Sequence, residues 1–174
     1  MQHIETVTVG SGGAASITFS AIPDTFTDLY VVCSVRTNRG IATFDGINIK
    51  INGSTANFSW RRLSALDGSL GSGNATNGES VYATSANATA NTFGSGQIYI
   101  PNYRSSVAKS ISAESVTENN ATNNALDIRA MLWNDTTAIT SIELYSATSS
   151  TLQQYSSASL YGVTAGSSGG VVVS

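Results

Sequence analysis

The sequence predicts an all-β protein, an antiparallel β-sandwich of jelly-roll type with about ten short strands. Three observations predict this class. Short runs alternate apolar and polar side chains, as strands with one buried face do. These runs recur about every ten residues, with Gly, Asn, Asp and Ser between them. Helical signals are weak throughout the chain.

The expected strands follow one another from the first residues to the last third of the chain. The first two runs alternate clearly, and the third is more continuously apolar, as in a strand covered on both sides. In the fourth, Ile47, Ile49 and Ile51 share one face, and Asn48 and Lys50 share the other. The expected strands are residues 4–9, 15–20, 28–37, 47–51, 58–66, 79–84, 95–101, 107–117, 124–133, 138–147 and 156–163.

Turn-forming residues separate the strands. Asn, Asp and Gly tolerate the positive φ of tight hairpins, which predicts turns at Asp45-Gly46, Asn52-Gly53, Asp67-Gly68 and Asn77-Gly78. Residues 67–78 are nearly all turn formers and predict a long exposed loop, and residues 85–93 predict a second one. Two interpretations of these loops stay open. They are either mobile surface connections or a recognition tip at one end of a rigid sandwich.

Size and composition favour one folded domain. A chain of 174 residues buries one core and is short for two. With 41% apolar residues and a net charge of −3 it does not have the composition of a disordered chain. We expect one sandwich domain over residues 1–165 and a Gly/Ser hinge with an apolar tail, Val171, Val172 and Val173, over residues 166–174. A valine run at a chain end would be an exposed edge strand, so we expect it to dock on another subunit or protein.

Charge and the N-terminal sequence argue against two kinds of partner. Eight basic residues face eleven acidic ones, and Arg61-Arg62 is the only adjacent basic pair, so no nucleic-acid partner is expected. The start of the chain lacks the basic and apolar segments of a signal peptide. No run approaches the roughly 20 apolar residues of a membrane span. Neither export by the usual route nor membrane insertion is expected.

The residues that carry most enzyme chemistry are scarce, so we expect a non-enzyme with no cofactor or metal. The only histidine, His3, lies near the chain start, and the only cysteine, Cys33, lies in the apolar phase of its run, where a buried and inert thiol is expected. One of each cannot form a zinc site. A carboxylate pair for glycoside hydrolysis is the enzymatic alternative, with no spacing that favours one pair among Glu114, Glu118, Asp127 and Glu143.

Two groups of aromatic and basic residues are candidate contacts. Most aromatic residues fall in strand-like runs, where packing is expected. The exceptions are Trp60 with Arg61 and Arg62, and Tyr103 with Arg104. An aromatic ring beside a guanidinium group is a common anchor for a sugar or a protein interface. These five residues are the candidate ligand or interface contacts, and packing is the alternative.

Four blocks of the sequence carry a family resemblance: residues 17–38, 51–63, 98–106 and 138–164. The first contains IPDTFT (22–27) between two strands, and the second reads INGSTANFSWRRL. The third reads IYIPNYRSS, and the last contains SSASLYG (156–162). On these blocks the chain resembles a group of small bacteriophage virion proteins, many of them from phages of cyanobacteria and marine bacteria. Residues 67–78 lie outside the resemblance.

The resemblance implies a β-sandwich built into a virion after synthesis in the host cytoplasm. It implies contact with other virion proteins and self-assembly, with a homotrimer expected because phage fibres and decorations often are trimers. A tail appendage, either a fibre or a tail-associated protein that contributes to attachment at a host surface glycan, is preferred. A capsid decoration protein of the cement or head-fibre kind is the alternative. From another class, a carbohydrate-binding module using Trp60, Arg61 and Tyr103 stays open.

Overall fold

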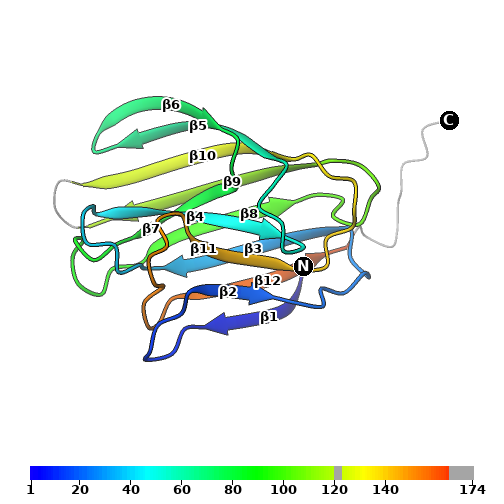
Figure 1. The fold of residues 1–174 in the computed structure, drawn as a ribbon, viewed down its shortest axis with the longest axis horizontal. Coiled ribbons are helices and arrows are strands. Elements are labelled where there is room, and N and C mark those ends of the chain that lie inside the picture. The colour runs from blue at the N-terminus through cyan, green and yellow to red at the C-terminus, as the bar shows by residue number, and fades with distance from the viewer. Residues whose placement is uncertain (120–122, 165–174) are drawn as a thin grey trace.

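The computed structural model describes residues 1–119 and 123–164, and within these ranges the chain forms twelve strands and no helix (Figure 1). Each of the eleven expected strands has a counterpart. The strands are β1 (Gln2–Thr8), β2 (Ser16–Phe19), β3 (Asp28–Val35), β4 (Phe44–Ile51), β5 (Phe58–Leu66), β6 (Ser69–Ala75), β7 (Glu79–Thr84), β8 (Gly94–Ile100), β9 (Lys109–Glu118), β10 (Asn124–Trp133), β11 (Ile142–Ser146) and β12 (Ser157–Val163).

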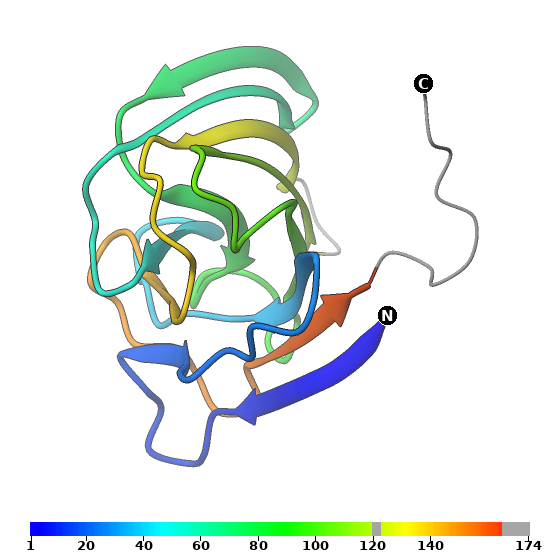
Figure 2. The ribbon, with the colours of Figure 1, turned by 90° about the vertical axis from the view of Figure 1, so that its right-hand side faces the viewer.

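The strands form two antiparallel sheets with the order of a jelly roll. In the described residues the larger sheet has eight strands in the order β1-β12-β3-β8-β9-β10-β5-β6, and the smaller has four in the order β2-β11-β4-β7. Without the hairpins β5–β6 and β9–β10, the sheet β1-β12-β3-β8 faces the sheet β2-β11-β4-β7. That is the two-sheet, eight-strand arrangement of a jelly roll, so the predicted fold class is confirmed. The two hairpins extend the larger sheet beyond the smaller one, and in the side view the sheet is strongly curved (Figure 2).

The hydrophobic core lies between the sheets and follows the predicted alternation. Ile47, Ile49 and Ile51 are fully buried, and Asn48 and Lys50 between them are half-buried on the other face of β4. Burying a side chain of this size contributes about 1.5–3 kcal/mol. Buried apolar residues of the facing sheet belong to the same cluster, among them Leu29, Val31, Ile98, Ile100 and Leu160.

The prediction of a long loop at residues 67–78 is wrong, because most of this segment is strand β6. Asp67 and Gly68 form a two-residue turn with φ of 50° and 78°, and β6 then pairs with β5 from Ser69 to Ala75. Positive φ at both turn positions matches the twist of the two strands. The long-range pairing with β5 therefore overrides the turn-forming composition of β6.

The predicted turn at Asp45-Gly46 is also wrong, because both residues lie inside β4. The Asp45 carboxylate is fully buried and accepts hydrogen bonds from Ser146 Oγ at 2.7 Å and Thr148 Oγ1 at 3.1 Å. These partners satisfy a buried charge that the sequence suggested was exposed. The turn at Asn52-Gly53 is present, with φ of 51° and 75°.

The predicted loop at residues 85–93 is present as an irregular connection between β7 and β8, and Arg36 holds it in place. Its guanidinium donates hydrogen bonds to the carbonyl oxygens of Ala88, Thr89 and Thr92 at 3.1, 2.9 and 2.9 Å. Hydrogen bonds from a charged donor are stronger than neutral ones. These hydrogen bonds hold residues 85–93 in place. They argue against the interpretation of this segment as a mobile connection.

The connections gather at two opposite ends of the sandwich (Figure 1). At the end that we call the terminal end, Gln2 pairs with Gly162, so the first and last strands have their free ends together. At the opposite end, the loop end, backbone hydrogen bonds join Ala14 to Leu152 and Asn38 to Thr151. The loop end carries the connections 9–15, 36–43, 85–93 and 147–156, and the terminal end carries 20–27, 101–108 and 134–141.

Three of the blocks that carry the family resemblance meet at the terminal end. The Phe26 ring lies on Gly162, where a Cβ would come within 2.2 Å of the ring. The Tyr103 hydroxyl donates a hydrogen bond to the carbonyl oxygen of Pro23. The shared motifs of these blocks therefore build a corner of the fold.

Candidate interaction surface

Strand β10 turns its apolar residues outward and its charges inward. Leu126, Ile128 and Leu132 are 52, 64 and 38% exposed, whereas Asp127 and Arg129 between them are 2 and 1% exposed. Because side chains alternate along a strand, the two sets must face opposite sides. The larger sheet therefore presents leucine and isoleucine to solvent at β10.

Cross-strand pairing extends this apolar surface over four strands. Val116 of β9 lies opposite Leu126, Leu126 lies opposite Ala65 of β5, and Ala65 lies opposite Leu70 of β6. A second row brings Ile128 opposite Leu63. Directly opposite residues on one face are in contact, so the rows form one continuous patch. We call this patch the outer face, defined by Leu63, Ala65, Leu70, Val116, Leu126, Ile128 and Leu132.

A groove of about 580 Å³ crosses the outer face. Its walls come from strands β3, β8, β9, β10, β5 and β6 of the larger sheet. The polar side chains along it include Gln97 and Glu114. Contiguous exposed apolar patches of this kind mark interaction sites in soluble proteins. The apolar lining is Val32, Leu63, Ala65, Leu70, Val116, Leu126 and Ile128.

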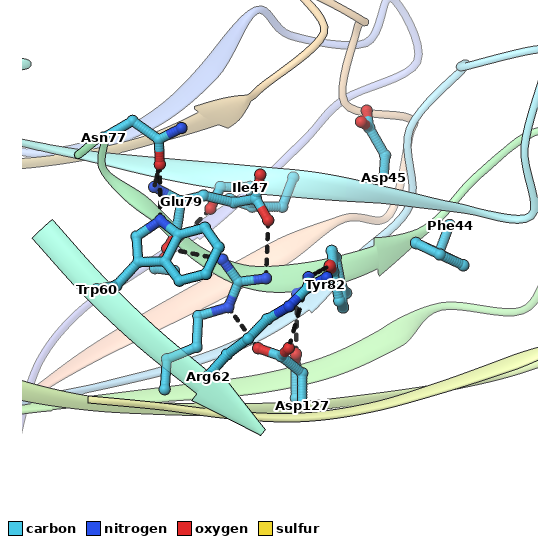
Figure 3. A network of polar contacts seen from close by, with 12 residues as sticks. Phe44, Asp45, Ile47, Trp60, Arg62, Asn77, Glu79, Tyr82 and Asp127 are labelled. Carbon is cyan, nitrogen blue, oxygen red and sulfur yellow. Dashed lines mark hydrogen bonds and ion pairs between the residues drawn. The ribbon is translucent and has the colours of Figure 1, made fainter. Parts of the chain in front are cut away.

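A buried cluster of charged and aromatic side chains lies on the opposite face of the same strands (Figure 3). The guanidinium carbon of Arg129 is 4.7 Å from the ring centre of Trp60 and 4.8 Å from that of Tyr82. Arg129 forms ion pairs with Asp127 and, at 2.7 Å, with Glu79. Stacking and ion pairing together satisfy a charge that is excluded from water.

Arg62 makes this cluster electrically balanced. Its guanidinium lies 3.9 Å from the Asp127 carboxylate and donates to the Tyr82 hydroxyl, so two cations face two anions. Burial is the largest single effect on Arg129 and lowers its pKa, but the hydrogen bonds and charges of Asp127 and Glu79 together outweigh it, so the pKa lies above its ordinary value. For Asp127, burial has the largest effect and raises its pKa.

The cluster also covers the free edge of the smaller sheet. Strand β7 ends that sheet, and its backbone groups face the inner side of the larger one. Arg129 donates to the carbonyl oxygen of Glu79 at 3.0 Å, and Ser115 Oγ accepts the Tyr82 N–H at 2.9 Å. Paired backbone groups at an edge cannot recruit another strand. The charged residues of β10 must therefore face the smaller sheet, where Arg129 binds the edge of β7. The apolar residues that alternate with them face solvent.

The structure separates the two aromatic residues that the sequence suggested as contacts. Trp60 is 7% exposed beneath the outer face, where its indole N–H donates to Asn77 Oδ1 at 2.7 Å. Tyr103 is 1% exposed at the terminal end. Both rings are packed, which was the alternative interpretation. A sugar cannot stack on either ring as they lie, so the carbohydrate-binding hypothesis has no exposed aromatic face at these positions.

The three arginines of the same set lie in different environments. Arg61 is exposed on the outer side of β5, beside the outer face, and Arg62 points into the buried cluster. Arg104 lies at the terminal end and donates to the carbonyl oxygen of Asp24. Arg61 is therefore the one that borders the outer face. The predicted assembly tail, Val171, Val172 and Val173, lies outside the described residues.

The carboxylates considered for glycoside hydrolysis do not converge. Glu114 lies on the outer side of the larger sheet and Asp127 on its inner side. Glu143 belongs to the smaller sheet and pairs with Lys50 at 3.0 Å. Within residues 1–119 and 123–164, no group of three or more His, Cys, Asp or Glu residues gathers as metal ligands would. The same ranges hold no helix that could cross a membrane.

Sequence reasoning missed the outer face. Its signal was present in residues 124–133, where two charged residues interrupt one alternating set and leucine and isoleucine fill the other. The alternation alone does not say which set faces the core. Comparison of the chain with models of protein families, with curated proteins and with solved structures finds no match in any of the three.

Proposed function

We propose that the protein is a non-enzymatic structural component of a bacteriophage virion, and that copies of the chain associate through the outer face. The observation that carries the self-association is the exposure of Leu63, Leu70 and Ile128, at 70, 91 and 64%. Removing apolar surface from water contributes about 25 cal/mol per Å². A contact between copies covers these side chains, which a single copy leaves in water.

The size of the outer face suits the centre of an interface between subunits. Four strands about 4.8 Å apart, each contributing about seven residues of 3.4 Å, cover roughly 20 by 24 Å. That is more than half of the ~800 Å² that each partner buries in a standard interface. Arg61 and Glu114 lie at its margin, as polar residues do around an interface core.

The place in the virion is inferred from the family resemblance, and the two ends of the sandwich support it. Both ends of the described chain leave from the terminal end, which suits attachment to other virion proteins there. The loop end then projects away from the particle, with the connections 36–43, 85–93 and 147–156, which are rich in Ser, Thr and Asn. We place the protein in a tail appendage, as a trimer, with the loop end facing the host surface and its glycans.

The test uses particles purified from cells infected by the virus that encodes this chain. Peptides of the chain should be recovered from the particles by mass spectrometry, and gold-labelled antibodies should bind at the tail. Labelling confined to the head would instead identify a capsid decoration protein. Purified protein, added in excess, should abolish the label. Recovery from infected cells but not from particles would contradict a virion role.

A further inference from the structure

The two sheets of the described residues have four edges, and three of these are protected against the addition of another strand. Strand β1 has an irregular register between His3 and Glu5, and β2 has only four residues. Strand β7 is covered by hydrogen bonds from Arg129 and to Ser115. Irregular, short or covered edges are the usual means by which proteins prevent strands from pairing between molecules.

Strand β6 is the edge without such protection. It has seven residues, no charged residue and no proline, and it pairs with β5 without any shift in register. Among the described strands, β5 is its only partner in the sheet. Leu70 on its outer side is 91% exposed, and Gly71 and Gly73 on its inner side carry no side chain. An edge of this kind is a template for one more strand.

We propose that residues 171–173 of a second copy of the chain add as a strand to the free edge of β6. The inference rests on the proposed self-association and names the segment that completes it. In the residues outside the described ranges, 120–122 and 165–174, the valine run is the only apolar run. Strand addition uses main-chain hydrogen bonds for affinity and alternate side chains for specificity.

The distance along the sheet favours an added strand from another copy. Strand β12 and strand β6 are six strand spacings apart along the sheet, or about 29 Å, and Figure 1 shows β6 at the upper margin and β12 in the lower part of the molecule. The seven residues from Thr164 to Val171 span at most about 25 Å. Donation from one copy to the next is a head-to-tail contact, which closes into a ring and is compatible with a trimer.

The chemistry of the two segments is complementary. A valine that points outward lies next to Leu70 and continues the row Val116, Leu126, Ala65 and Leu70 of the outer face. A valine that points inward lies beside Gly71, where Ser64 Oγ at 3.8 Å is the only atom within 4 Å of a Cβ position. Neither β6 nor the side chains of residues 165–174 carry a charge that pairing would remove from water.

Site-specific cross-linking between two variants tests the inference. One carries Val172→Cys and the other Ser72→Cys, at an exposed position of β6. The native Cys33 is buried and does not compete. After subunit exchange in a mixture of the two tagged proteins, a short bis-maleimide should join them. The matched control replaces Ser72→Cys by Thr18→Cys, which is exposed on β2 of the other sheet, and should give no product.

Two outcomes would overturn the inference. The first is equal cross-linking to Thr18→Cys, and the second is an assembly that keeps its mass when residues 166–174 are deleted. In the second case, dissociation of the same assembly by Leu63→Lys would leave the proposed self-association intact. A full chain that is monomeric would contradict the proposed self-association itself.

Discussion

Asp127 and Arg129 determine which way β10 faces. Both are buried, and their partners Glu79, Tyr82 and Trp60 come from β7 and β5. One face of β10 carries the two charged residues and the other carries leucine and isoleucine. The charged residues face inward because their partners, which are distant in the sequence, lie on the inner side of the sheet. The outer face is the consequence, because the remaining side chains have only the opposite side of the sheet.

Replacing Arg129 alone should destabilise the fold strongly. Arg129→Met removes the nearer of the two ion-pair partners of the buried Asp127 and leaves it only Arg62 at 3.9 Å. Breaking a buried pair costs about 3–5 kcal/mol. Urea denaturation at equal protein concentration should show this loss in the free energy of unfolding. The exposed Arg61→Met should change it by less than about 0.5 kcal/mol. Equal effects of the two variants would contradict the role assigned to the buried cluster.

Gly162 is required because the Phe26 ring occupies the space of its missing Cβ. Gly162→Ala would bring a methyl group within 2.2 Å of the ring, so we expect a loss of about 1–3 kcal/mol. The melting temperature should fall accordingly. Gly10→Ala is the matched control, since no atom lies within 4 Å of a Cβ built there. Identical melting temperatures for the two variants would refute the packing of Phe26 on Gly162.

The thiol of Cys33 should be unreactive in the folded protein. Burial raises its pKa to about 12, and a hydrogen bond from the Gly96 backbone only partly opposes this shift. At pH 8 the thiolate fraction is on the order of 10⁻⁴. A chromogenic disulfide reagent should therefore react slowly with native protein and fully in urea. Rapid reaction without denaturant would show that β3 is not covered.

At the scale of elements, the sequence contains enough information for eleven strands and too little for β6. The alternating runs predict β1 to β5 and β7 to β12, because their apolar residues recur at the period of a strand. The composition of β6 favours turns, and its strand conformation depends on hydrogen bonds to β5. Tertiary pairing of this kind cannot be read from a local segment.

The candidate site was less predictable than the strands for a related reason. Trp60 and Tyr103 were selected for the arginines next to them in the sequence. In the structure these arginines point elsewhere or serve the packing, and both rings are buried. The outer face depends on the register of four strands, and register results from pairing across the whole sheet.

A positive charge on the outer face should disrupt the assembly and spare the fold. Leu63→Lys and Ile128→Lys place an ammonium group at positions that are 70 and 64% exposed in a single copy. Sedimentation velocity should show dissociation, because the charge would be buried between subunits. Thr18→Lys, exposed on β2 of the other sheet, is the control and should leave the sedimentation unchanged. Unchanged sedimentation of both outer-face variants would exclude this surface as the interface.

At the scale of the whole molecule, the eight jelly-roll strands form the scaffold, and the two inserted hairpins carry most of the proposed interaction surface. The eight jelly-roll strands supply most of the core and fix the two ends, and the hairpin strands add Phe58, Ile111 and Trp133 to the same core. The hairpins β5–β6 and β9–β10 add the strands that cover the edge of β7 on one side and carry most of the outer face on the other. The hairpins therefore serve both the stability of the fold and its proposed association.

The most direct test of self-association is the mass of the full chain in solution by light scattering at micromolar concentration. The proposal predicts three times the 18.0 kDa of one chain, and a fall to 18.0 kDa for Leu63→Lys at unchanged circular dichroism. A wild-type mass of 18.0 kDa over the whole concentration range would contradict it, because the outer face would then be stable in water without a second copy.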